Sequence, residues 1–338
     1  MRYLLQLHGN LPACAYPDIA VQAESLGFED LTVHDVLLRR PVWPLLCEIA
    51  RVTDRIQVGP NVTHPYLNHP VKIAANIAHL DEVSNGRAVL GIGRGSMYDL
   101  IGMDPPAGGL TGLREAIDII RLLTQGGAGP YAGQVFDISG NARLMFGTPR
   151  RVPVYLGALG PRGARFAGRH CDGLRVAAQW DPTYLSSLRE EVARGATERG
   201  RAVDDVDLVA ENWTCLHPDR DVARRHARKI LATFLPHLGP LLDFHRIPAA
   251  EVEAARAAAG HEPGRADEIS DRTLDLFMAA GDASDLRAGL ERLAAANIDA
   301  VSFSGELGPD PSAAMQLIAD VINDRNGQPG VSPDMPGE

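Results

Sequence analysis

Lysine is almost absent from this chain of 338 residues, in which Lys72 and Lys229 are the only two. Both fall inside helical patterns and not at strand ends, so Schiff-base chemistry on a lysine is disfavoured. Cysteine is scarce as well, and its spacing fits neither a disulfide framework nor a zinc site. The four cysteines are Cys14, Cys47, Cys171 and Cys215. The sequence therefore indicates a reducing cytoplasm and no metal centre.

The chain also has no block of charge of one sign and no long apolar run. Its formal charge of -10 comes from 43 acidic and 33 basic residues, which argues against a nucleic-acid or anionic-membrane surface. No run approaches the roughly 18 apolar residues of a membrane span. The first residues, MRYLLQLHGN, enter a strand pattern without the features of a signal peptide. We expect a cytoplasmic protein that acts on a small molecule and binds neither nucleic acid nor membrane.

Short apolar segments recur along the chain with helical patterns between them. These segments are YLLQLH, DLTVHD, RIQVG, RAVLGIG, VPVYLG, DGLRVA, VDLVAENWT and IDAVSFSG. Eight strands that alternate with helices predict an α/β fold, a (β/α)8 TIM barrel, as one domain over residues 1–325. A doubly wound dinucleotide fold is the competing architecture. It fits less well, because Gly91, Gly93 and Gly95 make GxGxG instead of GxGxxG and follow the fourth strand, not the first.

Two segments exceed what a minimal barrel needs. Residues 130–150 predict a hairpin whose turn residues are Ser139, Gly140 and Asn141. Residues 235–280 form a long excursion that is partly helical through AAEVEAARAAAG. Such insertions cover the active face or serve as a dimer surface, and the sequence does not choose between these roles. The polar residues 326–338, rich in proline and glycine, predict a disordered tail.

Polar side chains gather where the first three strands end, and barrel active sites lie at the carboxyl ends of strands. His8 ends the first strand on the same face as Gln6 and is a candidate acid or ligand, although a structural hydrogen bond is the alternative. Asp35 ends the second strand, where it could instead cap a turn. After the third strand, prolines around Asn61, Val62, Thr63 and His64 predict irregular backbone that could face a ligand, or simply a loop.

The fourth strand lies in GRAVLGIGRG, and the glycines at its end indicate that another group comes close to the backbone there. Gly93 and Gly95 would let the backbone contact a flat or charged ligand, with Arg94 and Asp99 beside it; a tight turn is the alternative. After the fifth strand, Pro161 is suited to be a first helical residue. The amides of Gly160, Arg162 and Gly163 would then form an anion site that fits a phosphate, unless this is an ordinary helix start.

Three segments together resemble the bacterial luciferase-like superfamily. They are GF…D…VHD, VGPNVTHPYLNHP…IAANIAHLDEVSNGRAVLGIGRG and VPVYLGALGPRGARFAGRHCDGLRV. Within it the chain is most similar to the coenzyme F420-dependent oxidoreductases related to methylenetetrahydromethanopterin reductase. The resemblance implies a TIM barrel with insertions and a homodimer. It also implies that a flavin or deazaflavin binds at the carboxyl ends of the strands.

The resemblance assigns the cofactor contacts residue by residue. It makes Asp35 an acidic cofactor contact, Asn61-Val62 a cis peptide that supports the ring, and Thr63 and His64 ring or ribityl contacts. The loop beside the cofactor would consist of Gly93, Arg94, Gly95, Ser96 and Asp99. The phosphate-binding turn would consist of Leu159, Gly160, Pro161, Arg162 and Gly163. The ring system would then occupy the space that side chains at positions 93 and 95 would fill.

Two departures from the family pattern bear on function. Members that oxidise glucose 6-phosphate have a histidine after the strand-two acid and a glutamate in the strand-four loop, where this chain has Val36 and Ser96. A sugar-phosphate dehydrogenase is therefore disfavoured, and His8 and His64 become the candidates for proton transfer. We expect an F420-dependent oxidoreductase. The alternatives are an FMN-dependent monooxygenase and a non-catalytic flavin-binding barrel.

Overall fold

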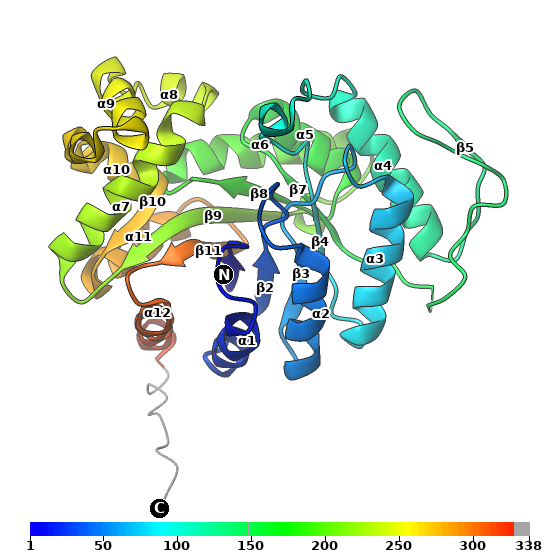
Figure 1. The fold of residues 1–338 in the computed structure, drawn as a ribbon, viewed down its shortest axis with the longest axis horizontal. Coiled ribbons are helices and arrows are strands. Elements are labelled where there is room, and N and C mark those ends of the chain that lie inside the picture. Colours follow the sequence, from blue (N-terminus) through cyan, green and yellow to red (C-terminus); the bar gives the residue numbers. More distant parts are fainter. Residues whose placement is uncertain (148, 328–338) are drawn as a thin grey trace, which may run out of the picture.

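Eight parallel strands form a barrel that is almost closed (Figure 1). The computed structural model describes residues 1–147 and 149–327. Neighbouring strands follow the order β3-β2-β1-β11-β9-β8-β7-β4, and bridges from Val58 to Ala88 and from Thr63 to Ile92 link the two ends. The strands are β1 (Arg2–Leu7), β2 (Asp30–Val33), β3 (Gln57–Pro60), β4 (Leu90–Ile92), β7 (Val154–Gly157), β8 (Gly173–Ala177), β9 (Asp207–Leu216) and β11 (Ala300–Leu307). All eight predicted strands are present, and the predicted TIM barrel is confirmed.

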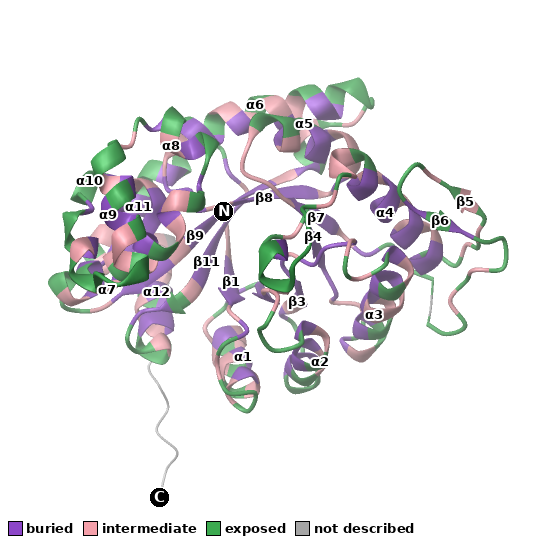
Figure 2. Cartoon of the chain, turned by 45° about the horizontal axis from the view of Figure 1, so that its top comes forward, coloured by how far each residue is buried: buried purple, intermediate pink, exposed green. Residues whose placement is uncertain are grey.

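Helices surround the barrel, with buried residues along the strands and exposed residues on the outer sides of the helices (Figure 2). They are α1 (Ala15–Ser25), α2 (Val42–Val52), α3 (Pro70–Val83), α4 (Gly109–Thr124), α5 (Pro161–His170), α6 (Pro182–Glu198), α7 (Arg220–Phe234), α11 (Ala283–Ala294) and α12 (Pro311–Asn326). In α4, the buried Leu113, Ile117 and Ile120 share one face because they are three or four residues apart. Within the described residues, no helix combines the length and hydrophobicity needed to cross a bilayer.

The barrel interior has an apolar layer below a polar one. Leu4, Val89, Tyr155, Val209 and Ala300 form a small cluster separate from the main core, and each is at most 7% exposed. We call these five residues the barrel plug. The next inward-facing residues on β1 and β9, two positions further on, are Gln6 and Glu211, and Arg175 lies over the Tyr155 ring with 5.1 Å between Cζ and the ring centroid. Polar and charged groups therefore replace the usual apolar filling towards the carboxyl end.

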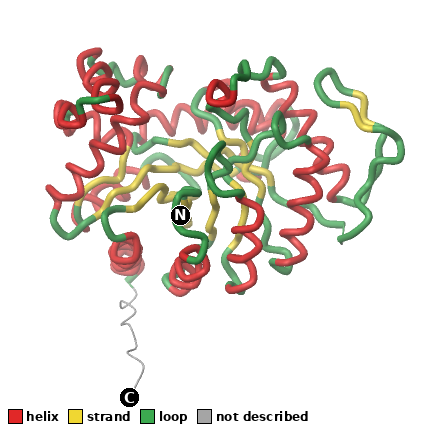
Figure 3. Tube along the Cα trace, in the orientation of Figure 1, coloured by secondary structure: helices red, strands yellow, loops and turns green. Residues whose placement is uncertain are grey.

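A hairpin follows α4 and projects from the barrel as a long loop with two short strands (Figure 3). Its strands β5 (Tyr131–Ala132) and β6 (Asp137–Ile138) pair in antiparallel fashion. The predicted turn position is wrong, because the chain reverses at residues 133–136 and not at Ser139, Gly140 and Asn141. The buried Glu115 of α4 explains this difference, since its carboxylate accepts the backbone N–H groups of Gln134, Val135 and Phe136.

The excursion after α7 packs beside β9. It contains α8 (Pro240–Phe244), α9 (Ala249–Gly260) and α10 (Asp271–Phe277), and it ends in β10 (Met278–Gly281), which pairs in parallel with the outer part of β9. The helix predicted from AAEVEAARAAAG is α9 and is confirmed. Of the predicted tail at 326–338, residues 328–338 lie outside the described part of the chain.

Carboxylates tie the strand starts together at the amino end of the barrel. Asp172 accepts hydrogen bonds from the backbone N–H of Val154 at 2.8 Å and from Arg121 at 3.0 Å, and it also accepts one from Arg151. In the same way, Asp207 accepts from Arg2 and Tyr155, and Asp299 from Arg189 and the Leu208 N–H. Each of these carboxylates joins a strand start to a neighbouring element.

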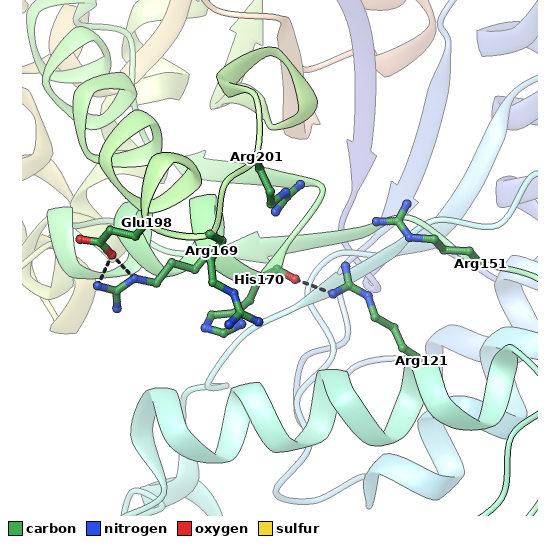
Figure 4. A pocket seen from close by; sticks show the side chains of 7 residues that line it. Arg121, Arg151, Arg169, His170, Glu198 and Arg201 are labelled. Atoms are coloured by element: carbon green, nitrogen blue, oxygen red, sulfur yellow. Dashed lines mark hydrogen bonds and ion pairs between the residues drawn. The ribbon is translucent and has the colours of Figure 1, made fainter.

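An arginine-rich pocket of about 520 Å³ lies at this same end, where α4, α5 and α6 finish (Figure 4). Arg121 donates to the His170 carbonyl at 2.7 Å, and Arg201 donates to the carbonyls of Gly168 and Cys171. Arg169 is paired with Glu198. Because the last carbonyls of a helix lack partners within the helix, these arginines complete the end of α5. We therefore interpret this pocket as a stabilising feature.

Candidate active site

A pocket of about 570 Å³, called here the main pocket, opens at the carboxyl ends of the strands. Its lining residues are His34, Asp35, Val36, Leu37, Asn61, Val62, His64, Gly93, Arg94, Gly95, Ser96, Leu110, Leu113, Leu156, Gly157, Ala158, Leu159, Arg175, Ala177 and Glu211. This is the end of a TIM barrel at which active sites lie. Nine residues predicted for the site are among them, namely Asp35, Asn61, Val62, His64, Gly93, Arg94, Gly95, Ser96 and Leu159.

The peptide bond between Asn61 and Val62 is cis, as the resemblance implies. Val62 projects from the end of β3 towards the ends of β4 and β7. A Cβ atom added to Gly93 would lie 2.8 Å from Val62 Cγ2, and one added to Gly157 would lie 2.5 Å from Val62 Cγ1. These contacts correct one part of the interpretation of Gly93, because Val62 and not a ligand fills the space that a side chain there would take; Gly93 also lines the main pocket, so its contact with a cofactor stays a prediction. Val62 in turn forms part of the pocket wall.

The surroundings of Gly95 are also formed by the protein itself. Its φ is +75°, and an added Cβ would lie 2.5 Å from Tyr98 Oη and 2.8 Å from His64 Cγ. Tyr98 Oη donates to the Arg94 carbonyl at 2.6 Å and lies 3.3 Å from His64 Nδ1. The loop after β4 therefore folds around the Tyr98 and His64 side chains. As at Gly93, protein atoms fill the space that a side chain at position 95 would take, while Gly95 itself lines the main pocket, so its contact with a cofactor stays a prediction.

Asp35 is held at the rim by two neutral donors. Thr63 Oγ1 donates to its carboxylate at 2.6 Å, and Asn68 Nδ2 lies at 3.3 Å. Thr63 is fully buried and does not line the main pocket, so the structure gives it a role in positioning Asp35. Since neither donor carries a charge, Asp35 brings a negative charge to the pocket wall.

Buried charges form the floor of the main pocket, and the sequence analysis did not identify them. Arg175 is paired with Asp30 of β2, and its Nη1 lies 4.0 Å from Glu211 Oε2. Glu211 also accepts a hydrogen bond from Asn61 Nδ2, while Gln6 Nε2 donates to the Asn61 carbonyl at 2.6 Å. This network connects the floor to the cis peptide. Arg175 Nε and Nη1 and Asn61 Oδ1 have no hydrogen-bond partner among the described residues.

Burial changes the pKa values of these groups. It raises the pKa of the Glu211 carboxyl to about 7, against the opposing effect of Arg175, and it also raises the pKa of Asp30. Glu211 is therefore a carboxyl group that changes protonation near neutral pH at the floor of a pocket. Perturbed groups of this kind are common at functional sites.

The two histidines predicted for catalysis are not brought together. His64 lines the main pocket, whereas His8 lines a separate pocket on the other side of β1. His8 instead stacks on His34, with 4.6 Å between the ring centroids. His34 lines the main pocket together with Asp35. Burial lowers the pKa of His8, His34 and His64, so all three are neutral at pH 7.

The predicted phosphate turn is present, but it borders the main pocket without lining it beyond Leu159. Pro161 is the first residue of α5, as expected, and no side chain caps the amino end of this helix. Gly160, Pro161, Arg162 and Gly163 lie outside the lining, and so does Asp99, which is exposed on the short 3-10 helix Tyr98–Ile101. The uncapped amides of α5 are thus within the first residues beyond the pocket rim.

The residues that sequence reasoning missed sit inside apolar runs. Arg175 and Glu211 occur in DGLRVA and VDLVAENWT, where they were treated as ordinary strand positions. A signal was present, since a charged residue within a strand that is buried on both faces needs a buried partner. Leu110, Leu113 and Leu156, which line the apolar wall, gave no comparable signal because they resemble any core residue.

Comparisons with known proteins agree with this geometry. Residues 8–300 match the model of the luciferase-like monooxygenase family. The 5,10-methylenetetrahydromethanopterin reductase of Archaeoglobus fulgidus is 33% identical over 311 residues, covering 89% of this chain and 92% of the reductase. An F420-dependent glucose-6-phosphate dehydrogenase of Microbacterium testaceum is 32% identical over 62% of this chain and 67% of its own.

The solved structures give the same result. The coenzyme F420-dependent tetrahydromethanopterin reductase of Methanopyrus kandleri superposes with a TM-score of 0.89 at 26% identity, covering 96% of this chain and 99% of the reductase. The family model spans most of the barrel, and the reductase resemblance extends over nearly the whole chain. The chain therefore belongs to the luciferase-like monooxygenase family, on a branch that it shares with the 5,10-methylenetetrahydromethanopterin reductases.

Proposed function

We propose that this protein is a coenzyme F420-dependent oxidoreductase that transfers a hydride between the deazaflavin and a small organic substrate. The observation that carries the proposal is that Val62 projects into the wall of a pocket of about 570 Å³ and forms a shelf there. Gly93 and Gly157 leave the space that the Val62 side chain occupies. The relatives named above as F420-dependent support the choice of cofactor.

The residues of the main pocket fit a flat ring system with a phosphorylated chain. Leu37, Leu110, Leu113 and Leu156 give it apolar walls. At its floor, Arg175 would place a positive charge beside the ring carbonyl oxygens. The uncapped start of α5 would receive the phosphate group, with Arg162 beside it. Asp35 would accept a hydrogen bond from the ribityl or ring edge.

A deazaflavin held by these residues would supply the hydride chemistry, in either direction between the ring and an electrophilic carbon of the substrate. His64 is suited to move the accompanying proton. Tyr98 Oη gives its hydrogen to the Arg94 carbonyl at 2.6 Å, so the contact of 3.3 Å with His64 requires Nδ1–H as donor. Nε2 of the neutral imidazole then carries no hydrogen and can accept a proton when a substrate alcohol is oxidised. His8 is a second candidate for this role, from the neighbouring pocket.

Titration of the purified protein with F420 and, separately, with FMN tests the proposal. We expect saturable binding of F420 and weaker binding of FMN, followed by oxidation or reduction of bound F420 by members of a small-molecule library. Gly157→Ala should weaken F420 binding about 10- to 100-fold, since overpacking against Val62 costs about 1–3 kcal/mol.

Gly260→Ala is the matched control, because nothing lies within 4 Å of the added Cβ. It should leave F420 affinity unchanged. Failure of F420 to bind would contradict the proposal. Tight FMN binding with oxygen consumption would instead identify a flavin monooxygenase, which the family description keeps as the second candidate. The homodimer and the cytoplasmic location stay predictions.

A further inference from the structure

A second pocket of about 310 Å³ lies at the carboxyl end of the barrel, on the other side of β1 from the main pocket. The ends of β1, β9 and β11 form its floor, and α7 forms one wall. His8, Trp213 and Glu306 line it from the strands, whereas His226, Lys229 and Phe234 line it from α7. The proposed function assigns no ligand to this space.

A pair of stacked histidines stands between the two pockets. His34 lines the main pocket and His8 lines the second pocket, with 4.6 Å between their ring centroids. A molecule in the second pocket therefore lies one imidazole pair away from the main pocket. Because hydride transfer needs contact between the reacting atoms, a substrate held in the second pocket must extend past the histidine pair to reach a ring held against Val62.

The charge of the second pocket is positive, in a chain whose formal charge is -10. Arg39 and Lys229 both line it, and neither takes part in an ion pair or a side-chain hydrogen bond with any described residue. Glu306 is the one carboxylate among its lining residues. It lies 3.3 Å from Asn10 Nδ2 and 3.6 Å from His226 Nε2. Two cations at one pocket without carboxylate partners favour an anionic occupant.

Two further features point to a ligand that is both acidic and flat. His8 Nε2 and His226 Nε2 are buried polar atoms at this pocket that have no hydrogen-bond partner in the described residues, and His226 Nε2 lies 3.6 Å from Glu306. Trp213 stacks on Phe234 with ring centroids 4.5 Å apart, and both side chains are half-buried at the pocket wall. An aromatic wall of this kind favours contact with a planar group.

We propose that the second pocket binds one end of the substrate, and that this end carries an oxyanion, a carboxylate or a phosphate, beside a planar apolar group. The oxyanion pairs with Arg39 and Lys229, and the planar group packs against Trp213 and Phe234. The assignment of this ligand as the substrate rests on the proposed function. Binding of the acid itself does not require it.

Isothermal titration calorimetry with three probes tests the inference. Cinnamate and phenyl phosphate carry the two kinds of oxyanion, and cinnamamide is the neutral control. We expect at least one acid to bind, at least tenfold more tightly than cinnamamide, both to the protein alone and to the protein saturated with F420. The tighter of the two acids identifies the source of the oxyanion.

Variants of α7 and of the loop after β2 locate the site. Lys229→Gln should weaken acid binding at least tenfold and leave cinnamamide binding unchanged, and Arg39→Gln should do the same. Arg225→Gln is the matched control, because Arg225 is exposed on the same helix but does not line the pocket. The control should bind the acids with the affinity of the original protein.

Three results would overturn the inference. These are equal binding of acid and amide, no binding of either acid, and acid binding that the Lys229→Gln and Arg39→Gln changes do not affect. Competition between F420 and cinnamate would also overturn the substrate assignment, because the two cations would then serve the cofactor tail. If F420 fails to bind while cinnamate binds as expected, the proposed function fails and the acid site stands.

Discussion

At the amino end of the barrel Asp172, Asp207 and Asp299 each accept two or three hydrogen bonds, whereas at the carboxyl end His8, Arg175 and His226 keep nitrogens without a partner. Buried polar groups in folded proteins are normally satisfied. The three carboxylates of the amino end have therefore completed their interactions and stabilise the fold, although Arg121 Nε beside them also lacks a partner among the described residues. The carboxyl end keeps polar capacity that a ligand can use. Four substitutions test this division.

Replacing Arg175 should have the largest effect. Arg175→Met leaves Asp30 and Glu211 buried without their cation, and loss of one partner of a buried ion pair costs about 3–5 kcal/mol. We expect this loss in the free energy of unfolding at pH 7, measured by urea denaturation. Arg151→Met at the amino end is the control, since the Arg151 side chain is 57% exposed and Asp172 keeps its other partners, so stability should change by less than about 1 kcal/mol. Equal effects at the two positions would contradict the division.

Glu211→Gln should change how stability depends on pH. The folded state raises the pKa of Glu211 from 4.5 to about 7, so it holds the proton more tightly than the unfolded state does. Relative to Glu211→Gln, the original protein should be most stable below pH 4.5 and should lose up to about 3 kcal/mol as the pH rises to 7. Urea denaturation of both proteins across this range gives the difference. A constant difference would show that Glu211 does not titrate there.

Asp172→Ala should lower stability without touching ligand binding. It removes acceptors of the Val154 N–H and of two arginines, which costs about 2 kcal/mol. We expect that loss in urea denaturation and an unchanged affinity for F420 in the same preparation. A fall in F420 affinity would mean that the two ends of the barrel are coupled.

Tyr98→Phe should give the smallest change. It removes the hydrogen bond to the Arg94 carbonyl and the contact with His64, worth about 1 kcal/mol. Because both partners line the main pocket, we expect F420 binding to weaken about fivefold, as measured by titration. An unchanged affinity would show that the loop after β4 keeps its shape without this hydroxyl.

Local patterns were sufficient to predict the barrel, because each strand is a short apolar run bounded by turn residues or by a helical pattern. The site was predictable where one segment contains the feature, as for Asn61-Val62 and the start of α5. Features that depend on the pairing of distant strands were not. Arg175 meets Asp30 across 145 residues, and Gly93 meets Val62 from a neighbouring strand. The hairpin turn was misplaced for the same reason, since Glu115 of α4 fixes it.

The barrel plug closes the amino end of the barrel interior, so the interior opens to solvent at the carboxyl end. Leu4, Val89, Tyr155, Val209 and Ala300 seal its bottom, so water and protons reach Glu211 and Arg175 from above. A molecule bound in the main pocket would block this opening. While it is bound, exchange of the Glu211 proton with solvent would be slowed.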